Sequence, residues 1–257
     1  MEFYQSLLRP NLTACPPWIY MLASLLTLPV TSCGPVNSHP STTAGKTQES
    51  GATTAIAFDY SGSVAGISHA GMPELVQLTD SLLASGKAMV VVFDAISSPS
   101  DLALVRLTLQ PLIPTTNLPL AQRASIAARN RAVIEKNRRA ALLFLQQCRK
   151  RIAWAIAMAE EEQTDLNGFL NKVAIFQQEP GVKDFRHCVF LQSDGDHDIL
   201  IKRNGRRVRI RGLKCPDWAD GVCLYVCNWK SAQTCGITQM FESTQGFLNY
   251  YFKQIKS

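Results

Sequence analysis

The sequence predicts an α/β fold with a doubly wound, mostly parallel sheet and helices on both of its faces. Apolar runs typical of buried strands alternate with segments of helical periodicity from about residue 53 onward. Two of the strand-like runs end in oxygen-rich turns, Asp59–Ser63 and Ser193–Gly195. Open parallel sheets place ligand sites at such strand ends. This segment of about 200 residues is large enough to bury a core of its own.

The amino-terminal half of this segment supplies three strands and one helix. Thr54–Phe58 is a short apolar run, and Lys87–Ile96 is a β-branched run typical of a central parallel strand. Between them, Met72–Ser85 carries leucines at helical spacing, and Gly86 supplies a stop signal. Ala103–Leu109 alternates apolar and polar residues, which predicts an edge strand.

The carboxyl-terminal half continues the alternation. Apolar residues recur at helical spacing from Phe169 to Phe176, and Cys188–Gln192 follows as a buried strand. Gly221–Asn228 predicts a further buried strand. Met240–Ile255 has aromatic and aliphatic residues on one side of a helical wheel, which predicts a closing amphipathic helix. The resulting strand and helix order favours right-handed crossovers.

A helical insertion is expected over residues 118–162, either as one long projecting helix or as a hairpin bending near Asn137. The segment lacks glycine and is rich in strong helix formers. Its basic residues are Arg123, Arg129, Arg131, Lys136, Arg138, Arg139, Arg149, Lys150 and Arg151. Its expected packing face consists of Leu142, Leu143, Leu145, Ile152, Trp154, Ile156 and Met158. That face packs either on its own domain or on a partner or membrane surface.

A basic β-hairpin is expected over residues 199–214, because Asn204-Gly205 separates two alternating arms. From Lys202 to Lys214 the sequence contains seven basic residues and no acidic one. The charges either protect an edge strand from aggregation or attract an acidic partner.

The amino terminus predicts export and anchoring. Trp18–Leu28 is an apolar stretch of signal-peptide length, and Leu28–Gly34 resembles a bacterial lipobox in which Cys33 becomes the lipidated residue. The alternative is a plain hydrophobic leader with Cys33 as a bystander. We therefore expect a leader at 1–33, a flexible tether at 34–52 and one domain at 53–257, held at a cell envelope and facing the periplasm or exterior.

The remaining six cysteines are compatible with disulfides in an oxidising compartment, although their spacing does not give the connectivity. They are Cys148, Cys188, Cys215, Cys223, Cys227 and Cys235. A zinc site made from the last four is the alternative. It is disfavoured because none of the gaps has the spacing of a CxxC knuckle.

Three motifs occur in a characteristic order: Asp59-Tyr60-Ser61-Gly62-Ser63 after a strand, Thr164-Asp165-Leu166 before a helix, and Ser193-Asp194-Gly195 after a second strand. Alone, each is an ordinary turn or helix cap. Together they resemble the von Willebrand factor A (VWA) domain family with its metal-ion-dependent adhesion site, over roughly residues 53–253. The resemblance implies a VWA/Rossmann-like fold.

The resemblance also implies a role for each residue. Ser61 and Ser63 match the serines that touch the metal, Thr164 matches a threonine that binds directly or through water, and Asp59 and Asp194 match the carboxylates. The segment beginning at Thr115 is a rival threonine segment. Thr164 is preferred because it precedes the helix that leads into the Asp194 strand. Such hard oxygens suit Mg²⁺ or Mn²⁺.

Three functions follow from these observations. The first is a non-enzymatic binding module whose metal accepts a carboxylate from a protein or other acidic ligand. The second is a basic-patch binder of nucleic acid or anionic lipid, which the net charge of +6 permits but 20 acidic residues disfavour. The third is a metal-dependent hydrolase with Asp59 as nucleophile, disfavoured because Ser61 stands where haloacid-dehalogenase enzymes place a second Asp, and neither a Ser-His-Asp order nor a nucleophile elbow is present. Asp196, His197 and Asp198 either add a second metal ligand or form an ordinary surface loop.

Overall fold

The structure is a computed structural model that describes residues 51–61, 71–116, 118–159, 163–218 and 221–256. The expected leader, Cys33, nearly all of the expected tether and Ser63 lie outside the described residues. No helix among the described residues is long and apolar enough to cross a membrane.

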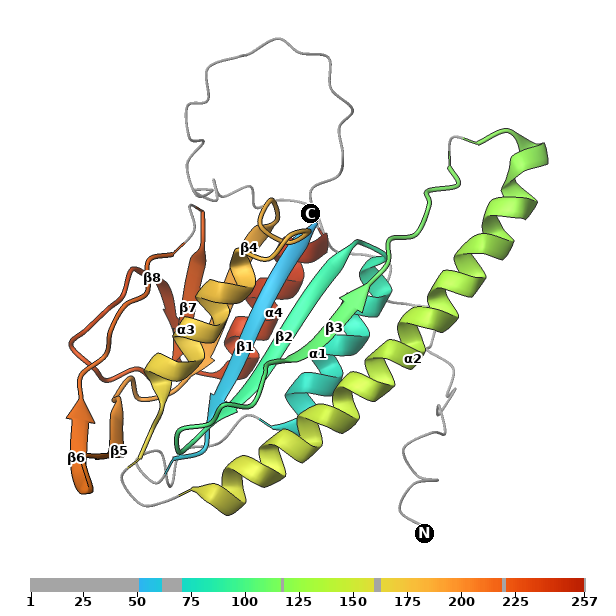
Figure 1. The fold of residues 1–257 in the computed structure, drawn as a ribbon. Helices are drawn as coiled ribbons and strands as arrows, with labels where there is room; N and C mark the ends of the chain where they lie inside the picture. The colour runs from blue at the N-terminus through green and yellow to red at the C-terminus, as the bar shows by residue number, and fades with distance from the viewer. Residues whose placement is uncertain (1–50, 62–70, 117, 160–162, 219–220, 257) are drawn as a thin grey trace, which may run out of the picture. The chain divides into compact units, whose positions relative to one another are not determined.

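Six strands form one mixed sheet in the order β3-β2-β1-β4-β7-β8 (Figure 1). The strands are β1 (Ala52–Asp59), β2 (Met89–Ile96), β3 (Val105–Leu109), β4 (Arg186–Gln192), β7 (Cys223–Cys227) and β8 (Ile237–Phe241). All neighbouring strands are parallel except β3, which runs antiparallel to β2 at the edge. The predicted doubly wound, mostly parallel α/β fold is confirmed.

The sheet has its switch point between β1 and β4. After β1 the chain builds outward through β2 and β3, and it then returns to β4 and builds the other way through β7 and β8. In open α/β sheets, ligands bind beyond the carboxyl ends of the strands at this point, because the loops there turn in opposite directions. Asp59 is the last residue of β1, and Ser193 directly follows β4.

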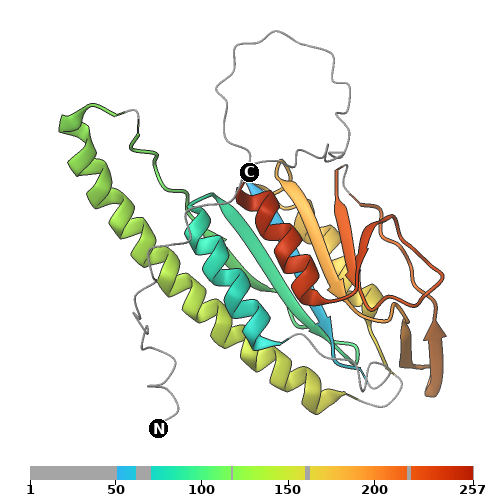
Figure 2. The ribbon, with the colours of Figure 1, turned by 180° about the vertical axis from the view of Figure 1, so that it is seen from behind.

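Helices cover both faces of the sheet (Figures 1 and 2). They are α1 (Met72–Ser85), α2 (Leu120–Met158), α3 (Leu166–Gln177) and α4 (Thr244–Lys256). Buried side chains of α1, α2 and α4 share one core with the sheet, and those of α3 fill a second core on the opposite face. The predicted bounds of α1 are confirmed, and Gly86 ends it with a left-handed φ of 65°.

The insertion is one unbroken helix, α2, with 39 residues. Its buried face was predicted only in part, because Ile152 is buried and Leu145 and Trp154 pack against the core. Leu142, Leu143, Ile156 and Met158 are 46–59% exposed, whereas Asn137 and Arg151 are buried. Asn137 is buried because it bonds to the backbone of Gln110. Arg151 is buried because it pairs with Asp94 and donates to the Ala103 carbonyl. A hydrophobic pattern does not reveal such distant partners.

Two asparagines join α2 to the chain that continues from β3. Asn137 accepts a hydrogen bond from the Gln110 backbone N–H (3.0 Å) and donates one to the Gln110 carbonyl (2.8 Å). Asn130 makes the same pair of bonds with Ile113, at 3.0 and 2.8 Å. Each side-chain amide therefore makes the two backbone hydrogen bonds that a neighbouring strand would otherwise make. Helix α2 in this way covers the edge of the sheet beside β3 (Figure 1).

Replacing Asn137 by alanine is expected to lower the free energy of unfolding by about 1–3 kcal/mol, because two backbone groups of Gln110 lose their partners. Denaturant unfolding measures the change. The exposed neighbour Arg138, replaced by alanine, is the matched control and is expected to leave stability nearly unchanged. Equal stability of the two variants would show that the asparagine does not hold the edge.

Of two elements in the carboxyl-terminal part, the hairpin was predicted correctly and the closing helix was predicted with the wrong first residue. The hairpin is confirmed as β5 (Asp198–Arg203) and β6 (Arg206–Arg211), with positive φ at both Asn204 and Gly205. The predicted closing helix began too early. Met240 and Phe241 belong to β8, and α4 begins at Thr244. Strand β8 was not predicted, because its side chains are partly or largely exposed and its sequence lacks a regular alternation of apolar and polar residues.

Candidate metal centre

Asp59 lies at the end of β1 and is 1% exposed. One carboxylate oxygen accepts the backbone N–H of Ser61 at 2.9 Å. The other accepts the hydroxyl of Ser193 at 2.7 Å. Because Ser193 follows β4, the second bond joins the ends of the two strands at the switch point.

Asp194 lies one residue further along and is 5% exposed. Its side chain accepts the Asp196 backbone N–H at 3.1 Å, and its carbonyl accepts the N–H groups of Lys230 and Ser231 at 2.8 and 3.0 Å. Gly195 turns the chain with a φ of 85°, and a Cβ there would lie 2.7 Å from the Trp229 ring. The turn therefore needs glycine, and it holds Asp194 inward.

These two carboxylates lack a cationic partner among the residues that the structure describes. Burial raises the pKa of Asp59, and the nearby charge of Asp194 raises it further, while hydrogen bonds from Ser193 and Ser61 oppose the rise. None of the ion pairs between described side chains includes either residue. A bound cation would offset the two buried negative charges.

Hydroxyl groups surround the same end of the sheet. Ser61 and Thr164 are 2% and 3% exposed. Thr164 exchanges two backbone hydrogen bonds with Asp198, at 2.7 and 3.2 Å. The next residue, Asp165, donates its backbone N–H to the Ser97 carbonyl at 2.8 Å, which places this segment beyond the end of β2. The structure therefore brings Asp59, Ser61, Thr164 and Asp194 to one end of the sheet, where the parallel strands have their carboxyl ends.

The rival Thr115 lies elsewhere. It follows β3, which runs antiparallel to β2, and the intervening Leu112 hydrogen-bonds to the Gly86 carbonyl just before β2 begins. Thr115 therefore belongs to the opposite end of the sheet from Asp59.

Two serines at this end of the sheet have roles that were not predicted from the sequence. Ser193 donates to Asp59 and accepts the Gly195 N–H at 3.1 Å, so it fixes the orientation of the carboxylate. Ser97, at the end of β2, is 1% exposed, and its hydroxyl has no hydrogen-bond partner among the described residues. The signal for both was available, since each follows a predicted strand directly.

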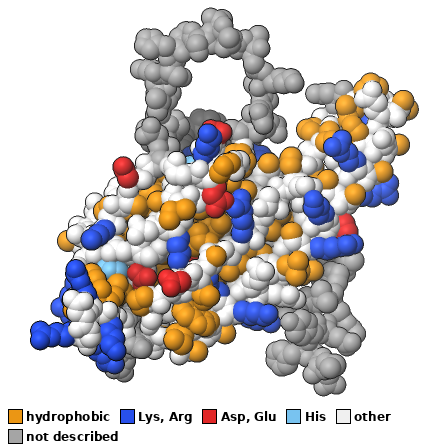
Figure 3. Space-filling view, in the orientation of Figure 1, with side chains coloured by type: hydrophobic (Ala, Val, Ile, Leu, Met, Phe, Trp, Pro, Cys, Tyr) orange, Lys and Arg blue, Asp and Glu red, His pale blue; other side chains and the backbone are white. Residues whose placement is uncertain are grey.

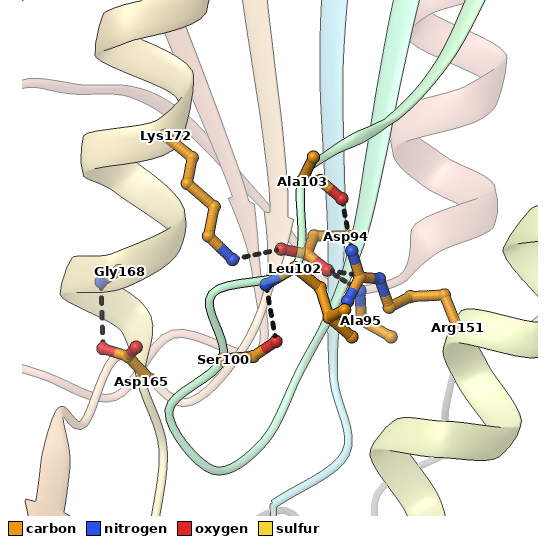
Figure 4. A network of polar contacts seen from close by, with 9 residues as sticks. All are labelled: Asp94, Ala95, Ser100, Leu102, Ala103, Arg151, Asp165, Gly168 and Lys172. Carbon is orange, nitrogen blue, oxygen red and sulfur yellow. Dashed lines mark hydrogen bonds and ion pairs between the residues drawn. The ribbon is translucent and has the colours of Figure 1, made fainter.

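A buried charge network lies just before Ser97 on β2 (Figure 4). Asp94 pairs with Arg151 of α2 and with Lys172 of α3, both at 3.2 Å. Arg151 also donates to the Ala103 carbonyl. Burial raises the pKa of Asp94, an effect that Lys172 and Arg151 oppose. Asp94 thus ties helices from opposite faces of the sheet to the strand that ends at the site.

The side chains of Asp198 and His197, in the loop after Asp194, are held by contacts within the protein. Asp198 forms ion pairs with Arg209 (2.8 Å) and Arg211 (3.0 Å) at the base of the hairpin. His197 Nδ1 accepts the Asn167 backbone N–H at 3.4 Å, and burial lowers the pKa of this histidine. Both side chains therefore have structural partners.

The donor set fits a hard divalent cation. The described residues contain no group of three or more His, Cys, Asp or Glu side chains arranged to hold a metal. What gathers at the switch point is two carboxylates with several hydroxyls, and such oxygens suit Mg²⁺ or Mn²⁺. The cysteines do not form the alternative zinc set, because Cys215 and Cys235 form a disulfide while Cys223 and Cys227 are buried on β7.

No protein-family model matches the chain, and no match is found among curated proteins. Among solved structures, the chain is similar to the pilus adhesin SpaC from Lactobacillus rhamnosus GG in its open conformation, at 12% identity and a TM-score of 0.39, over 81% of this chain and 30% of that one. It is also similar to proximal thread matrix protein 1 from the mussel byssus, whose MIDAS motif is occupied by zinc, at 13% identity and a TM-score of 0.34, over 80% and 47%.

A third similar structure is an aerotolerance-related membrane protein from Bacteroides fragilis, at 12% identity and a TM-score of 0.29, over 80% of this chain and 86% of that one. The chain spans less than half the length of the first two structures. At these identities and TM-scores the likenesses carry no argument about family or function.

Proposed function

We propose that the protein is a non-enzymatic, divalent-metal-dependent binding module held at a bacterial cell envelope. Its metal, Mg²⁺ or Mn²⁺, is held by Asp59, Ser61, Ser63, Thr164 and Asp194, and its anchor is lipidated Cys33. The observation that carries the proposal is the pair Asp59 and Asp194, buried at the switch point without a cationic partner among the described residues.

The chemistry of this set favours an acidic ligand. Both oxygens of Asp59 already accept protein hydrogen bonds, so contact with the ion through a water molecule suits it better than full coordination. With Asp194 also holding the ion through water, the direct ligands are neutral hydroxyls, and the ion keeps much of its positive charge. A carboxylate from a protein or another acidic ligand then completes the coordination shell.

The described histidines support binding over hydrolysis. His187 lies near the start of β4, at the opposite end of the sheet, and His197 is engaged with Asn167. Neither of these described histidines hydrogen-bonds to Asp59, whose two carboxylate oxygens accept from Ser61 and Ser193. The second candidate function, binding of nucleic acid or anionic lipid, draws on the exposed cations of the β5–β6 hairpin.

Thr164→Ala is expected to weaken Mn²⁺ binding about tenfold, the equivalent of about 1.4 kcal/mol. Electron paramagnetic resonance of free Mn²⁺ measures the affinity of the full chain. Thr115→Ala is the matched control and is expected to bind as the wild type does. A larger loss in Thr115→Ala than in Thr164→Ala would move the site to the opposite end of the sheet.

The same Mn²⁺-loaded protein tests the open coordination position. Adding a short glutamate-rich peptide is expected to reduce the water-proton relaxation caused by Mn²⁺, because a carboxylate displaces a coordinated water. A peptide with glutamine in place of glutamate is the control. Unchanged relaxation with saturating acidic peptide would contradict the proposed mode of binding.

A further inference from the structure

The β5–β6 hairpin has two chemically different faces. The register pairs Leu200 with Arg209 and Lys202 with Arg207, so these side chains share one face. The opposite face is apolar along most of its length and carries arginines beside the turn. Its residues are Ile199, Ile201, Arg203, Arg206, Val208 and Ile210.

The hairpin has more basic side chains than the acidic side chains that pair with them can neutralise. Asp198 pairs with Arg209 and Arg211 and so holds the base of the cationic face together. No ion pair between described residues involves the remaining exposed cations, which are Lys202, Arg203, Arg206 and Arg207. Figure 3 shows basic side chains gathered over the hairpin, at the lower left.

The outer strand of the hairpin offers a free edge. Among the described residues, β6 pairs with β5 alone. The other edge of β5 is engaged, because Asp198 pairs with Thr164 and the Leu200 N–H donates to the Gln163 side chain at 3.1 Å. A strand edge lined by arginine resists pairing with another copy of itself, since like charges on adjacent strands repel.

We propose that the edge of β6 receives an extended segment of a partner protein in which acidic and apolar residues alternate. Backbone hydrogen bonds to β6 provide affinity, as in other cases where a peptide adds a strand to a sheet. Alternate side chains of the added strand point to opposite faces. The acidic ones meet Lys202 and Arg207, and the apolar ones meet Val208 and Ile210 on the opposite face.

A partner strand fits these features better than a membrane or a nucleic acid. Neither of those supplies backbone N–H and C=O groups for a strand edge, and neither presents charge and apolar surface at the two-residue period of the hairpin. The hairpin surface acts without the metal. It nevertheless adjoins the metal centre, because β5 starts where Asp198 pairs with Thr164.

The test uses the full chain in EDTA, so that metal binding plays no part, and measures its affinity for a fluorescent peptide that alternates glutamate and valine. The double variant Lys202→Glu, Arg207→Glu is expected to lose about tenfold or more in affinity, with a reduced salt dependence. The control is Arg149→Glu, Lys150→Glu on the exposed side of α2, which changes net charge equally and is expected to retain binding. The hairpin variant is expected to gain affinity for a peptide that alternates lysine and valine, which also shows that it is folded.

Backbone methylation separates strand pairing from charge attraction. Because neighbouring N–H groups of a strand point to opposite edges, one peptide is methylated on its glutamate nitrogens and another on its valine nitrogens. One of them is expected to lose binding and the other to keep it. Equal affinity of both would overturn the proposal, as would equal affinity of a peptide with its glutamates in one block. Tighter binding to phosphatidylserine vesicles or to a single-stranded oligonucleotide at the same salt would also overturn it.

Discussion

Arg151→Ala is expected to lower the free energy of unfolding by about 3–5 kcal/mol, a large share of the stability of a domain of this size. Arg151 and Asp94 are each about 6% exposed at their side chains, so removing the guanidinium leaves a buried carboxylate with Lys172 alone. The Ala103 carbonyl also loses a donor. Denaturant unfolding measures the change, and exposed Arg149→Ala is the control, expected within about 0.5 kcal/mol of wild type.

The loss in Arg151→Ala is expected to grow with rising pH. Burial already raises the pKa of Asp94, and removal of a neighbouring cation raises it further. A raised carboxyl pKa in the folded state favours folding at low pH, and this contribution disappears as pH rises through the folded pKa. The variant is therefore closest to wild type under acid conditions. Asp94→Asn added to Arg151→Ala is expected to recover part of the loss at neutral pH, and failure to recover would contradict the buried-charge explanation.

Asp59→Asn is expected to remove the stabilisation of the protein by Mg²⁺. A metal that binds only the folded state stabilises it by about 2.7 kcal/mol at about 100 times its dissociation constant. Thermal unfolding with Mg²⁺ and with EDTA measures the difference. In EDTA the variant is expected to be at least as stable as wild type, because burial disfavours the charge of Asp59.

Asp196→Asn is the matched control for the metal effect, because Asp196 lies on the same loop as Asp194 but is exposed. It is expected to keep the full shift with Mg²⁺. If Asp59→Asn kept that shift as well, Asp59 would have only a structural role at the switch point. If both variants lost it, the loss would reflect general charge around the loop.

The sequence predicted features that depend on neighbouring residues. The periodic leucines and Gly86 predicted α1 with its observed bounds, and Asn204-Gly205 predicted the hairpin, because a local backbone preference decides each. The strand ends that carry Asp59 and Asp194 were predicted for a similar reason. Each follows a continuous apolar run, and the fold order then brings the two runs side by side.

The features that sequence did not predict depend on distant partners. Asn130 and Asn137 bond to main-chain groups of Ile113 and Gln110. Arg151, two seven-residue steps further along α2, bonds to the Ala103 carbonyl and pairs with Asp94. Exposed leucines nearby suggested a different buried face. The Cys215–Cys235 disulfide could not be read from spacing.

Calorimetric titration of Mg²⁺ and Mn²⁺ into the full chain tests the central claim most directly. One site is expected in the wild type, and that binding is expected to be lost when Asp59 and Asp194 are both replaced by asparagine. The two substitutions remove charge while keeping the shape of the side chains. Equal heat and equal affinity in wild type and double variant would contradict the assignment of a metal to the switch point between β1 and β4.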